Sequence, residues 1–546
     1  MTGRLRATLP AALPVALALV AGLAAHIGGA WNGFTNWDDP GYLLDNPLTV
    51  RPLADGVQGL LGTTRLGYPV PVTVLFYAVE RGLYGLEACA FHLVSIGLHL
   101  ICVALVWRLA RRLGAGAWAA AGAAAIFAVH PVAVEPVAWV VGQKDLLAAA
   151  LLLAALVVRS RPDGAGGRAS ALVGLLAVLA IGAKPSAVAA VVLIPGLDLA
   201  LGRRIDRAGA ALIAVVAAAA ITSTGLSLVG HGFVGGEPPA PFGARSLAAA
   251  LWSVWLQAQH LVWPDPLLAR YFPPDGAALA AGAAVGALLI AAVIGGAVMA
   301  WRRGRRAVAF SLAGALVAYA PVSGLVPLSR GAADSYLYLP LALGTLGLAL
   351  GLTGVAARRR IVVGGAIVAA IALALGAVSV RQTAMWRDSP SLWAPVARAY
   401  PDDPRALMRL GDAHLFTGDL GGAVREYEAL HRRFPDFATS LPAHAAALDG
   451  LGRAAEAEAL LALAVRLDPR EPNLEGYGFF LATHEIAPGD DRAAHLSIIT
   501  VGRLLAARGK RPATVRRAAR LLRGYGEVAL AAALERRLAE LEQRRR

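Results

Sequence analysis

Charged residues are scarce in this chain. Of its 546 residues, 16% are Asp, Glu, Lys or Arg, whereas 57% are hydrophobic. A typical soluble domain contains about 25% charged residues, so this composition argues against a water-soluble fold. Acidic residues are the scarcer kind, with 36 against 51 basic ones. The basic residues lie in short clusters between apolar runs, without interleaved aromatic residues, and this pattern argues against a nucleic-acid partner.

Cysteine is nearly absent. The two cysteines, Cys89 and Cys102, fall in one apolar segment, and neither a zinc site nor a disulfide framework is expected from such a pair. At the N-terminus, Arg4 and Arg6 precede an apolar run in the manner of a signal peptide, but many further apolar runs follow. We interpret this segment as an uncleaved first membrane helix.

Long apolar runs dominate the first 381 residues. A helix needs about twenty apolar residues to cross a bilayer. Two of the apolar runs do not meet this requirement fully: the run 115–138 contains His130 and Glu135, and the run 146–158 has too few residues. Seven runs have the required length without a charged residue: 7–30, 88–107, 208–230, 277–300, 307–329, 335–357 and 361–380.

Clusters of arginine predict the direction of these helices. Cytoplasmic loops of membrane proteins are enriched in Arg and Lys. The clusters ending at Arg168 and beginning at Arg203 both belong to that side, so the run 169–197 between them must hold two helices joined by an outer turn at Lys184-Pro185. The count then gives about eleven crossings. The N-terminus is expected in the cytoplasm, and the chain after Arg381 on the outer side.

A different pattern, helical periodicity punctuated by Gly and Pro, begins at Asp403. Residues 403–435 and, more weakly, 436–469 match the 34-residue spacing of tetratricopeptide repeats. The first helix pair is expected to join at Gly418-Asp419. Such repeats commonly bind proteins or peptides on a concave face. For 475–543, a generic helical bundle is the alternative.

These patterns predict two domains. Residues 1–381 form a polytopic membrane domain, and residues 382–546 form an extracytoplasmic, tetratricopeptide-repeat-like helical domain. The fold class is therefore all-α.

Ionisable residues near the outer ends of the predicted helices are candidates for function, because charge at membrane depth is costly. A carboxylate can act there as a general base, and Lys or Arg can stabilise charge that develops on a phosphate leaving group. We take Asp38 and Asp39 as candidate catalytic residues. The candidate substrate-binding residues are His130, Glu135, Lys144, Asp145, Lys184, Arg330, Asp334 and Tyr336.

Three of these residues are expected to lie below the outer surface. The run 146–158 is too short to span, so Lys144 and Asp145 before it should lie in a polar cavity. Lys184 is flanked by short apolar runs and should be recessed as well. A recessed ammonium requires an anionic partner, and that partner is either Asp145 or a phosphate group of a ligand.

Simpler interpretations exist for several of these residues. Asp38-Asp39-Pro40 is also consistent with a helix-capping turn, and Lys144-Asp145 with a structural ion pair. His92 and His99, seven residues apart on one helix face, indicate packing or hydrogen bonding rather than metal ligation. The tryptophan-containing stretch 252–263 is typical of an interfacial belt, and a lipid-donor groove is the alternative.

The order of these motifs resembles that of the bacterial relatives of the transmembrane and tetratricopeptide-repeat O-mannosyltransferases, members of the GT-C glycosyltransferase superfamily. The most specific pieces are the segment 34–39, His92 and His99, and the segment 130–147. Two features depart from the family: Gln143 stands where Arg is common, and only two repeats are recognisable. By this resemblance, the acidic residue of the first outer loop, Asp38 or Asp39, is the catalytic or metal-organising carboxylate. We favour Asp38.

The resemblance implies a glycosyltransferase that moves a sugar, with mannose as one candidate, from a polyprenyl-phosphate donor to an acceptor hydroxyl. The implied acceptor is a protein Ser or Thr bound through the repeat domain, and the implied place is the outer face of a bacterial cytoplasmic membrane. A non-catalytic scaffold that recruits envelope proteins and a transporter are the alternatives. The sequence does not decide whether a divalent cation takes part.

Overall fold

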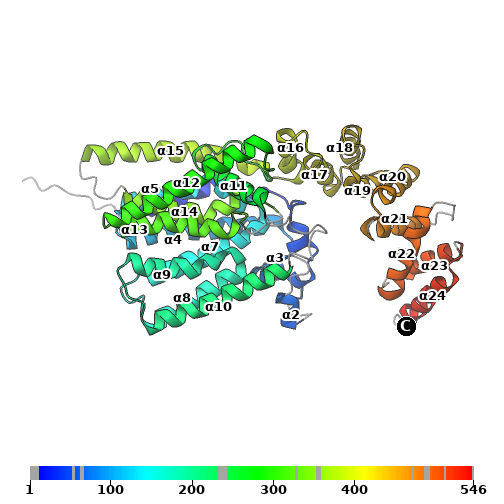
Figure 1. The fold of residues 1–546 in the computed structure, drawn as a ribbon, viewed down its shortest axis with the longest axis horizontal. Helices are drawn as coiled ribbons and strands as arrows, with labels where there is room; N and C mark the ends of the chain where they lie inside the picture. The colour runs from blue at the N-terminus through cyan, green and yellow to red at the C-terminus, as the bar shows by residue number, and fades with distance from the viewer. Residues whose placement is uncertain are drawn as a thin grey trace, which may run out of the picture. The chain divides into compact units, whose positions relative to one another are not determined.

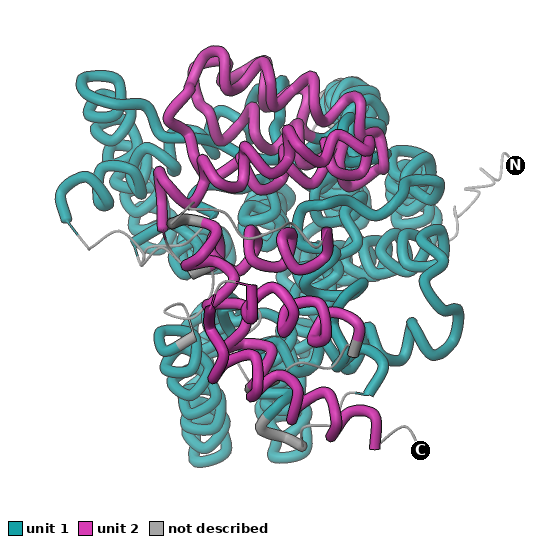
Figure 2. Tube along the Cα trace, turned by 90° about the vertical axis from the view of Figure 1, so that its right-hand side faces the viewer, with its two compact units in different colours: residues 1–392 teal, residues 393–546 magenta. Residues whose placement is uncertain are grey.

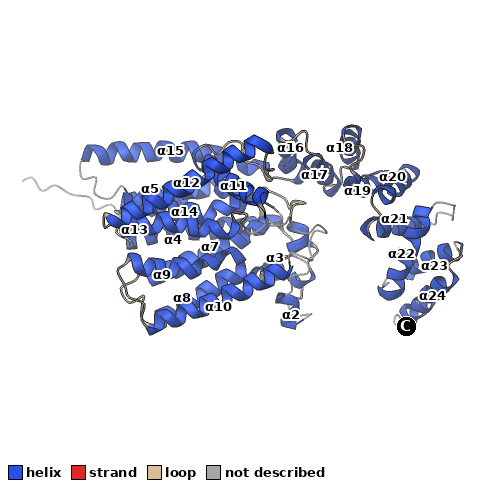
Figure 3. Ribbon diagram, in the orientation of Figure 1, coloured by secondary structure: helices blue, strands red, loops and turns tan. Residues whose placement is uncertain are grey.

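Every regular element is a helix in the part of the chain that the computed structural model describes (Figure 3). The predicted all-α fold is therefore confirmed. Contacts divide the chain into two compact units, 1–392 and 393–546 (Figure 2). The described residues are 12–51, 56–61, 67–230, 243–325, 330–351, 358–469, 471–484, 492–508, 512–524 and 526–543.

Unit 1 is built from long apolar helices that run side by side, and the shorter α2 and α3 lie at one end of them (Figure 1). Its helices are α1 (Leu13–His26), α2 (Gly56–Leu61), α3 (Pro71–Tyr84), α4 (Ala88–Arg112), α5 (Ala117–Val129), α6 (Val134–Ala138), α7 (Gln143–Arg159), α8 (Gly167–Ala183), α9 (Ala190–Ala200), α10 (Arg207–Gly230), α11 (Ala244–Val262), α12 (Gly276–Arg302), α13 (Arg306–Tyr319), α14 (Tyr338–Gly351) and α15 (Arg358–Met385).

Six helical segments of the described chain are long and apolar enough to cross a membrane. A bent pair, Ala117–Val129 with Pro131–Ala138, makes seven if it counts as one span. The chain is therefore a multi-pass membrane protein. Each of the eleven predicted segments contains a helix, but α8, α9, α13 and α14 are short, so the count of eleven stays a prediction. Arg4, Arg6 and parts of the runs 7–30, 307–329 and 335–357 lie outside the described residues.

Two helix breaks position the polar segments, and both precede a proline. The residue before proline disfavours the helical conformation because the proline ring would clash with it. His130 has an extended backbone, so α5 ends at Val129 and the following helical segment is bent by 57° from it. Lys184 is likewise extended, and α8 ends at Ala183. The turn predicted at Lys184-Pro185 is therefore confirmed.

A close backbone approach fixes the segment between α6 and α7. A Cβ atom at Gly142 would lie 2.6 Å from the carbonyl oxygen of Pro136, a distance that real side chains do not adopt. Only glycine therefore lets the chain turn here and begin α7 at Gln143.

A buried ion pair between Arg159 and Asp198 lies at the C-terminal end of α7. Arg159 Nε donates to Asp198 Oδ1 at 2.8 Å, and Arg159 Nη2 donates to Asp198 Oδ2 at 2.6 Å. The remaining Nη1 donates to the Gly164 carbonyl and to the Ser170 hydroxyl. Both carboxylate oxygens and all three guanidinium nitrogens are thus satisfied, which offsets the cost of burying the two charges.

Unit 2 consists of helices connected by short turns. In the first pair, Gly418 has a φ of 80° and the Asp419 side chain caps α18, so the turn lies where the spacing predicts it. Assignment of these helices to tetratricopeptide repeats, and a domain boundary after residue 381, stay predictions. The helices from the end of unit 1 onward are α16 (Ser389–Ala399), α17 (Pro404–Phe416), α18 (Leu420–Arg433), α19 (Leu441–Gly450), α20 (Ala454–Leu467), α21 (Glu471–His484), α22 (Arg492–Arg508), α23 (Pro512–Gly524) and α24 (Val528–Gln543).

Replacement of Arg159 by Met should destabilise unit 1 by about 3–5 kcal/mol, because it leaves the buried Asp198 carboxylate without its main partner. Thermal unfolding of the purified protein in detergent measures the loss. The double variant with Asp198→Asn should recover part of it, since no unpaired charge remains. Arg381→Met, which breaks an exposed pair with Asp265, is the control and should cost about 0–1 kcal/mol. An equal loss in the single and double variants would contradict this account.

Candidate active site

The two adjacent aspartates of the first loop have different surroundings. The Asp39 side chain is buried, and its Oδ2 accepts hydrogen bonds from the backbone nitrogen of Thr35 at 2.6 Å and from the Thr35 hydroxyl at 3.2 Å. The Asp38 side chain is 42% exposed, and its Oδ2 lies 3.9 Å from Lys144 Nζ. Asp39 therefore holds the turn, whereas Asp38 is accessible to a reactant.

The loop that carries these aspartates is held from both sides. Arg81 Nη1 of α3 donates to the Leu43 carbonyl and to the Thr49 hydroxyl, each at 2.9 Å. The Asn46 side chain accepts from the Leu48 backbone nitrogen at 3.1 Å and so caps the turn Pro47–Thr49. These bonds satisfy buried backbone groups and fix the loop against α3.

Lys144 lies at the start of α7 and is buried. Its ammonium is 4.1 Å from the centroid of the Tyr42 ring and 5.0 Å from that of the Trp139 ring. Such cation–π contacts are favourable in a desolvated site. Among the described residues Lys144 forms no hydrogen bond, and Asp38 at 3.9 Å is its ion-pair partner. An ion pair between Lys144 and Asp145 is not found in the described structure.

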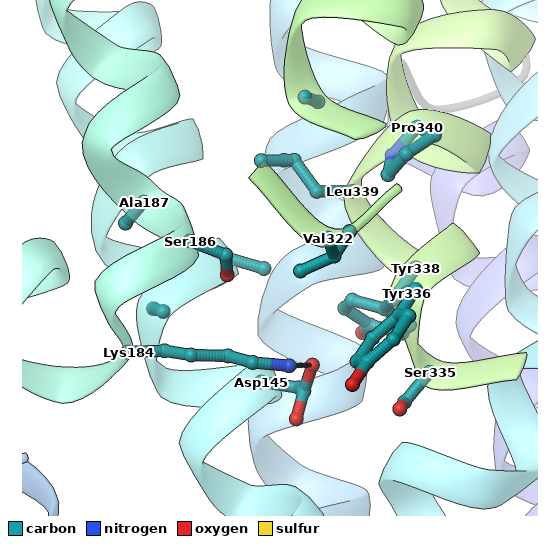
Figure 4. A pocket seen from close by; sticks show the side chains of 13 residues that line it. Asp145, Lys184, Ser186, Ala187, Val322, Ser335, Tyr336, Tyr338, Leu339 and Pro340 are labelled. Carbon is teal, nitrogen blue, oxygen red and sulfur yellow. Dashed lines mark hydrogen bonds and ion pairs between the residues drawn. The ribbon is translucent and has the colours of Figure 1, made fainter. Parts of the chain in front are cut away.

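Lys184 pairs with Asp145. Both side chains are buried, and the Lys184 ammonium also lies 5.3 Å from the centroid of the Tyr336 ring. Figure 4 shows the ammonium and the carboxylate meeting beside Tyr336. They line a cavity that has a volume of about 30 Å³. Of the two partners that the sequence allows for Lys184, the structure shows Asp145.

Arg330 forms the third cationic centre. Its Nη1 lies 2.7 Å from Glu135 Oε1, and its Nη2 donates to the Ala269 carbonyl at 3.0 Å. The guanidinium lies 5.1 Å from the Trp37 ring centroid and 5.3 Å from that of Trp139. The Trp139 ring therefore contacts both Lys144 and Arg330, and the three cations of the site are each matched by a carboxylate.

The side chains of His130 and Asp334 hydrogen-bond to neighbouring protein groups. The Tyr271 hydroxyl donates to Asp334 Oδ2 at 2.8 Å, and His260 Nδ1 lies 2.9 Å from Asp334 Oδ1. His130 Nδ1 accepts from the Val132 backbone nitrogen, and its Nε2 lies 3.2 Å from the Leu261 carbonyl. The Asp334 contact with His260 joins the 330–338 segment to α11, and the His130 contact with Leu261 joins the end of α5 to the same helix. The substrate-binding role of both residues stays a prediction.

Several residues of this region make contacts that the sequence does not predict. Gln257 and His260 of α11 reach the segment before Tyr338, because Gln257 Nε2 donates to the Ala333 carbonyl at 2.9 Å. Their spacing of three puts both side chains on one face of the amphipathic helix α11, and this is the signal that could have identified them. Glu80 of α3 is the other case: it accepts from the Tyr84 hydroxyl at 2.5 Å and from Gln143 Nε2 at 3.1 Å.

His99 hydrogen-bonds within the helix bundle, as expected. Its Nδ1 lies 2.7 Å from the Tyr338 hydroxyl and its Nε2 lies 3.0 Å from the Ala128 carbonyl. Within the described ranges, no group of three or more His, Cys, Asp or Glu side chains is arranged to hold a metal ion.

Removal of the Asp39 charge should change how stability depends on pH. Burial raises the pKa of Asp39 from 3.8 to about 7, because a carboxylate loses hydration there. The folded state then binds the proton more tightly than the unfolded state, so this group's contribution to stability is full in acid and is lost as pH rises from about 4 to about 7. Melting temperatures of wild type and Asp39→Asn should therefore diverge across this range, with the wild type losing relative stability. A difference independent of pH would contradict this prediction.

Comparison with known proteins identifies sequence relatives. The chain is 50% identical over 64 residues to the protein O-mannosyl-transferase Tmtc2 of Drosophila melanogaster, covering 12% of this chain and 7% of that protein. It is 33% identical over 152 residues to Tmtc1 of the same organism, covering 28% of this chain and 17% of that protein. The matches thus span a small part of these longer relatives. No protein-family model matches the chain.

Two solved structures show a distant likeness. ArnT from Cupriavidus metallidurans, bound to undecaprenyl phosphate, is 18% identical with a TM-score of 0.35, over 89% of this chain and 84% of that one. The arabinofuranosyltransferase AftD from Mycobacteria is 15% identical with a TM-score of 0.36, over 72% of this chain and 28% of that one. Over the stretches matched in sequence, the chain is similar to the Tmtc O-mannosyl-transferases, as the resemblance of its motifs predicts.

Proposed function

We propose that the chain is a membrane glycosyltransferase of the GT-C type that moves a sugar from a polyprenyl-phosphate donor to an acceptor hydroxyl. One observation carries the proposal: an accessible carboxylate, Asp38, lies 3.9 Å from a buried ammonium, in a cluster with two further buried cations at the ends of apolar helices. The names of the sequence relatives support mannose as the sugar and a protein hydroxyl as the acceptor.

Asp38 is the proposed general base. It accepts the proton of the acceptor hydroxyl while the hydroxyl oxygen attacks the anomeric carbon of the sugar. The bond between this carbon and the phosphate oxygen breaks, and polyprenyl phosphate leaves. A single displacement of this kind inverts the configuration at the anomeric carbon. Asp39 cannot easily replace Asp38, because its carboxylate is buried and bound to Thr35.

Lys184 and Arg330 are the proposed contacts of the donor phosphate. Both are cations at the ends of apolar helices, and Tyr336 lies near both: the Lys184 ammonium is 5.3 Å from its ring, and Arg330 interacts with it electrostatically. Preorganised cations stabilise charge that develops on a leaving phosphate without having to reorganise during the reaction. Lys144 instead pairs with Asp38, whose Oδ2 lies 3.9 Å from its ammonium.

The C-terminal unit is the proposed acceptor-binding domain on the outer side of the membrane. The spacing predicted for its first helix pairs is typical of peptide-binding repeats. The arginine clusters of the membrane half support a position outside the cytoplasm for the chain after Arg381.

Asp38→Asn should lower transfer by about 10² to 10⁴, the usual contribution of a general base, whereas Asp39→Asn should retain most activity. Cells lacking the gene are complemented with the wild type or with either variant, and their envelope glycoproteins are compared by mass spectrometry. The glycoform that disappears with the gene names sugar and acceptor. Near-normal glycosylation by Asp38→Asn, at equal protein level, would exclude the proposed base, and unchanged glycoproteins in the deletion strain would exclude the proposed function.

The location of the C-terminal unit is tested separately. Protease added to intact spheroplasts should remove residues after Arg381, because the arginine pattern predicts that they are outside. The same protease should leave the loop that contains Arg302 to Arg306 intact until the cells are lysed. Survival of the C-terminal unit in intact spheroplasts would reverse the predicted orientation.

A further inference from the structure

The cavity beside Lys184 is polar but too small for a ligand of the proposed class. It has a volume of about 30 Å³, which is room for about two water molecules and too little for a sugar phosphate. Its polar side chains come from three separate segments: Asp145, then Lys184 with Ser186, then Ser335 with Tyr336 (Figure 4). The cation that would attract a phosphate here is already neutralised by the protein's own carboxylate.

The bond between Lys184 and Asp145 is incomplete on the carboxylate side. Asp145 Oδ1 pairs with Lys184 Nζ, but Asp145 Oδ2 is buried without a hydrogen-bond partner. A buried acceptor without a partner costs free energy. Asp198, at the other end of α7, has both oxygens bound by Arg159. Asp145 is therefore held by one contact and is easier to release than Asp198.

A second cation is placed to receive the released carboxylate. Lys144 is the neighbour of Asp145 in sequence, and the two side chains interact electrostatically. The Lys144 ammonium lies against the rings of Tyr42 and Trp139, with the Asp38 carboxylate 3.9 Å away and no hydrogen bond among the described residues. An ion pair between Lys144 and Asp145 would replace the one between Lys144 and Asp38.

Lysine at positions 144 and 184 is unusual for this chain, in which most basic residues are arginine. Lys and Arg together number 51, and only three are Lys: Lys144, Lys184 and Lys510. Arginine binds a carboxylate through two parallel bonds, as Arg159 does, whereas lysine is a compact charge with rotatable donors. Lysine is therefore suited to a site in which a cation changes partners.

We propose that Asp145 is a resident anion that occupies the place of the donor phosphate on Lys184. On binding, the phosphate of the polyprenyl-phosphate donor takes over Lys184, and Asp145 turns to Lys144. Lys144 then releases Asp38, whose carboxylate becomes free to accept the acceptor proton. Asp38 is thus available as a base only when the donor is bound. This inference rests on the proposed function, because it assumes a polyprenyl-phosphate ligand.

The test measures binding of undecaprenyl phosphate to the purified full-length protein in lipid nanodiscs. Asp145→Asn should bind about tenfold more tightly than the wild type or better, because no internal anion competes for Lys184. Lys184→Arg keeps the charge but should bind about tenfold more weakly, since arginine holds Asp145 with two bonds. The double variant should recover the lost affinity. Asp265→Asn, at the exposed pair with Arg381, is the control and should match the wild type.

Other outcomes separate this inference from the proposed function. Binding by the wild type with equal or weaker binding by Asp145→Asn would show that Asp145 positions Lys184 and does not compete with phosphate. If Asp145→Asn fails to fold, the Lys184→Arg variant tests the inference instead. Binding of undecaprenyl phosphate by Lys184→Arg with the affinity of the wild type would contradict the proposed exchange of Asp145 for phosphate. Absence of binding by the wild type would overturn the polyprenyl-phosphate donor, and the inference with it.

Discussion

The two ends of α7 each carry a buried ion pair, and the membrane half depends on how these charges are matched. Charge that is buried among apolar helices is tolerated only when a partner satisfies it. At one end, Arg159 and Asp198 saturate each other and join α7 to α8 and α9. At the other end, Lys184 and Asp145 are paired but not saturated. The Arg159–Asp198 pair is suited to stabilising the fold. The Lys184–Asp145 pair leaves one carboxylate oxygen, Asp145 Oδ2, without a hydrogen-bond partner.

Two breaks in the helices bring the charged residues of the candidate site together. Breaks before Pro131 and Pro185 stop helices short of full length, and they bring Lys184 and the segment after His130 to the end of the bundle. The ring of Trp139 lies near both Lys144 and Arg330, while Tyr42 lies near Lys144 and Trp37 near Arg330. These cation–π contacts stabilise the two charges, and the Asp38 carboxylate beside Lys144 stays partly exposed.

The helices and the turn at Lys184-Pro185 could be predicted from the sequence because hydrophobic run length and arginine position depend on local composition. The different surroundings of Asp38 and Asp39 could not, since they arise from two hydrogen bonds between Thr35 and Asp39 and from burial in the folded loop. Which carboxylate pairs with Lys144 and which with Lys184 depends on how segments about forty residues apart pack together. The sequence alone does not show this packing.

The contacts of Glu80 and of the polar face of α11 could not be predicted for a related reason. A glutamate in an outer loop and a tryptophan-containing amphipathic helix are both typical of surface segments. Only the folded chain shows that Glu80 meets Gln143, and that His260 of α11 meets Asp334.

Photo-crosslinking tests the central claim most directly. Undecaprenyl phosphate with a diazirine in the isoprene unit next to the phosphate is added to the wild-type protein in nanodiscs, irradiated, and the labelled peptides are identified by mass spectrometry. The account predicts label in peptides that contain Asp145, Lys184 or Tyr336, and its loss when unlabelled undecaprenyl phosphate competes. Label confined to peptides at the Arg159 end of α7, or label that unlabelled lipid does not displace, would contradict it.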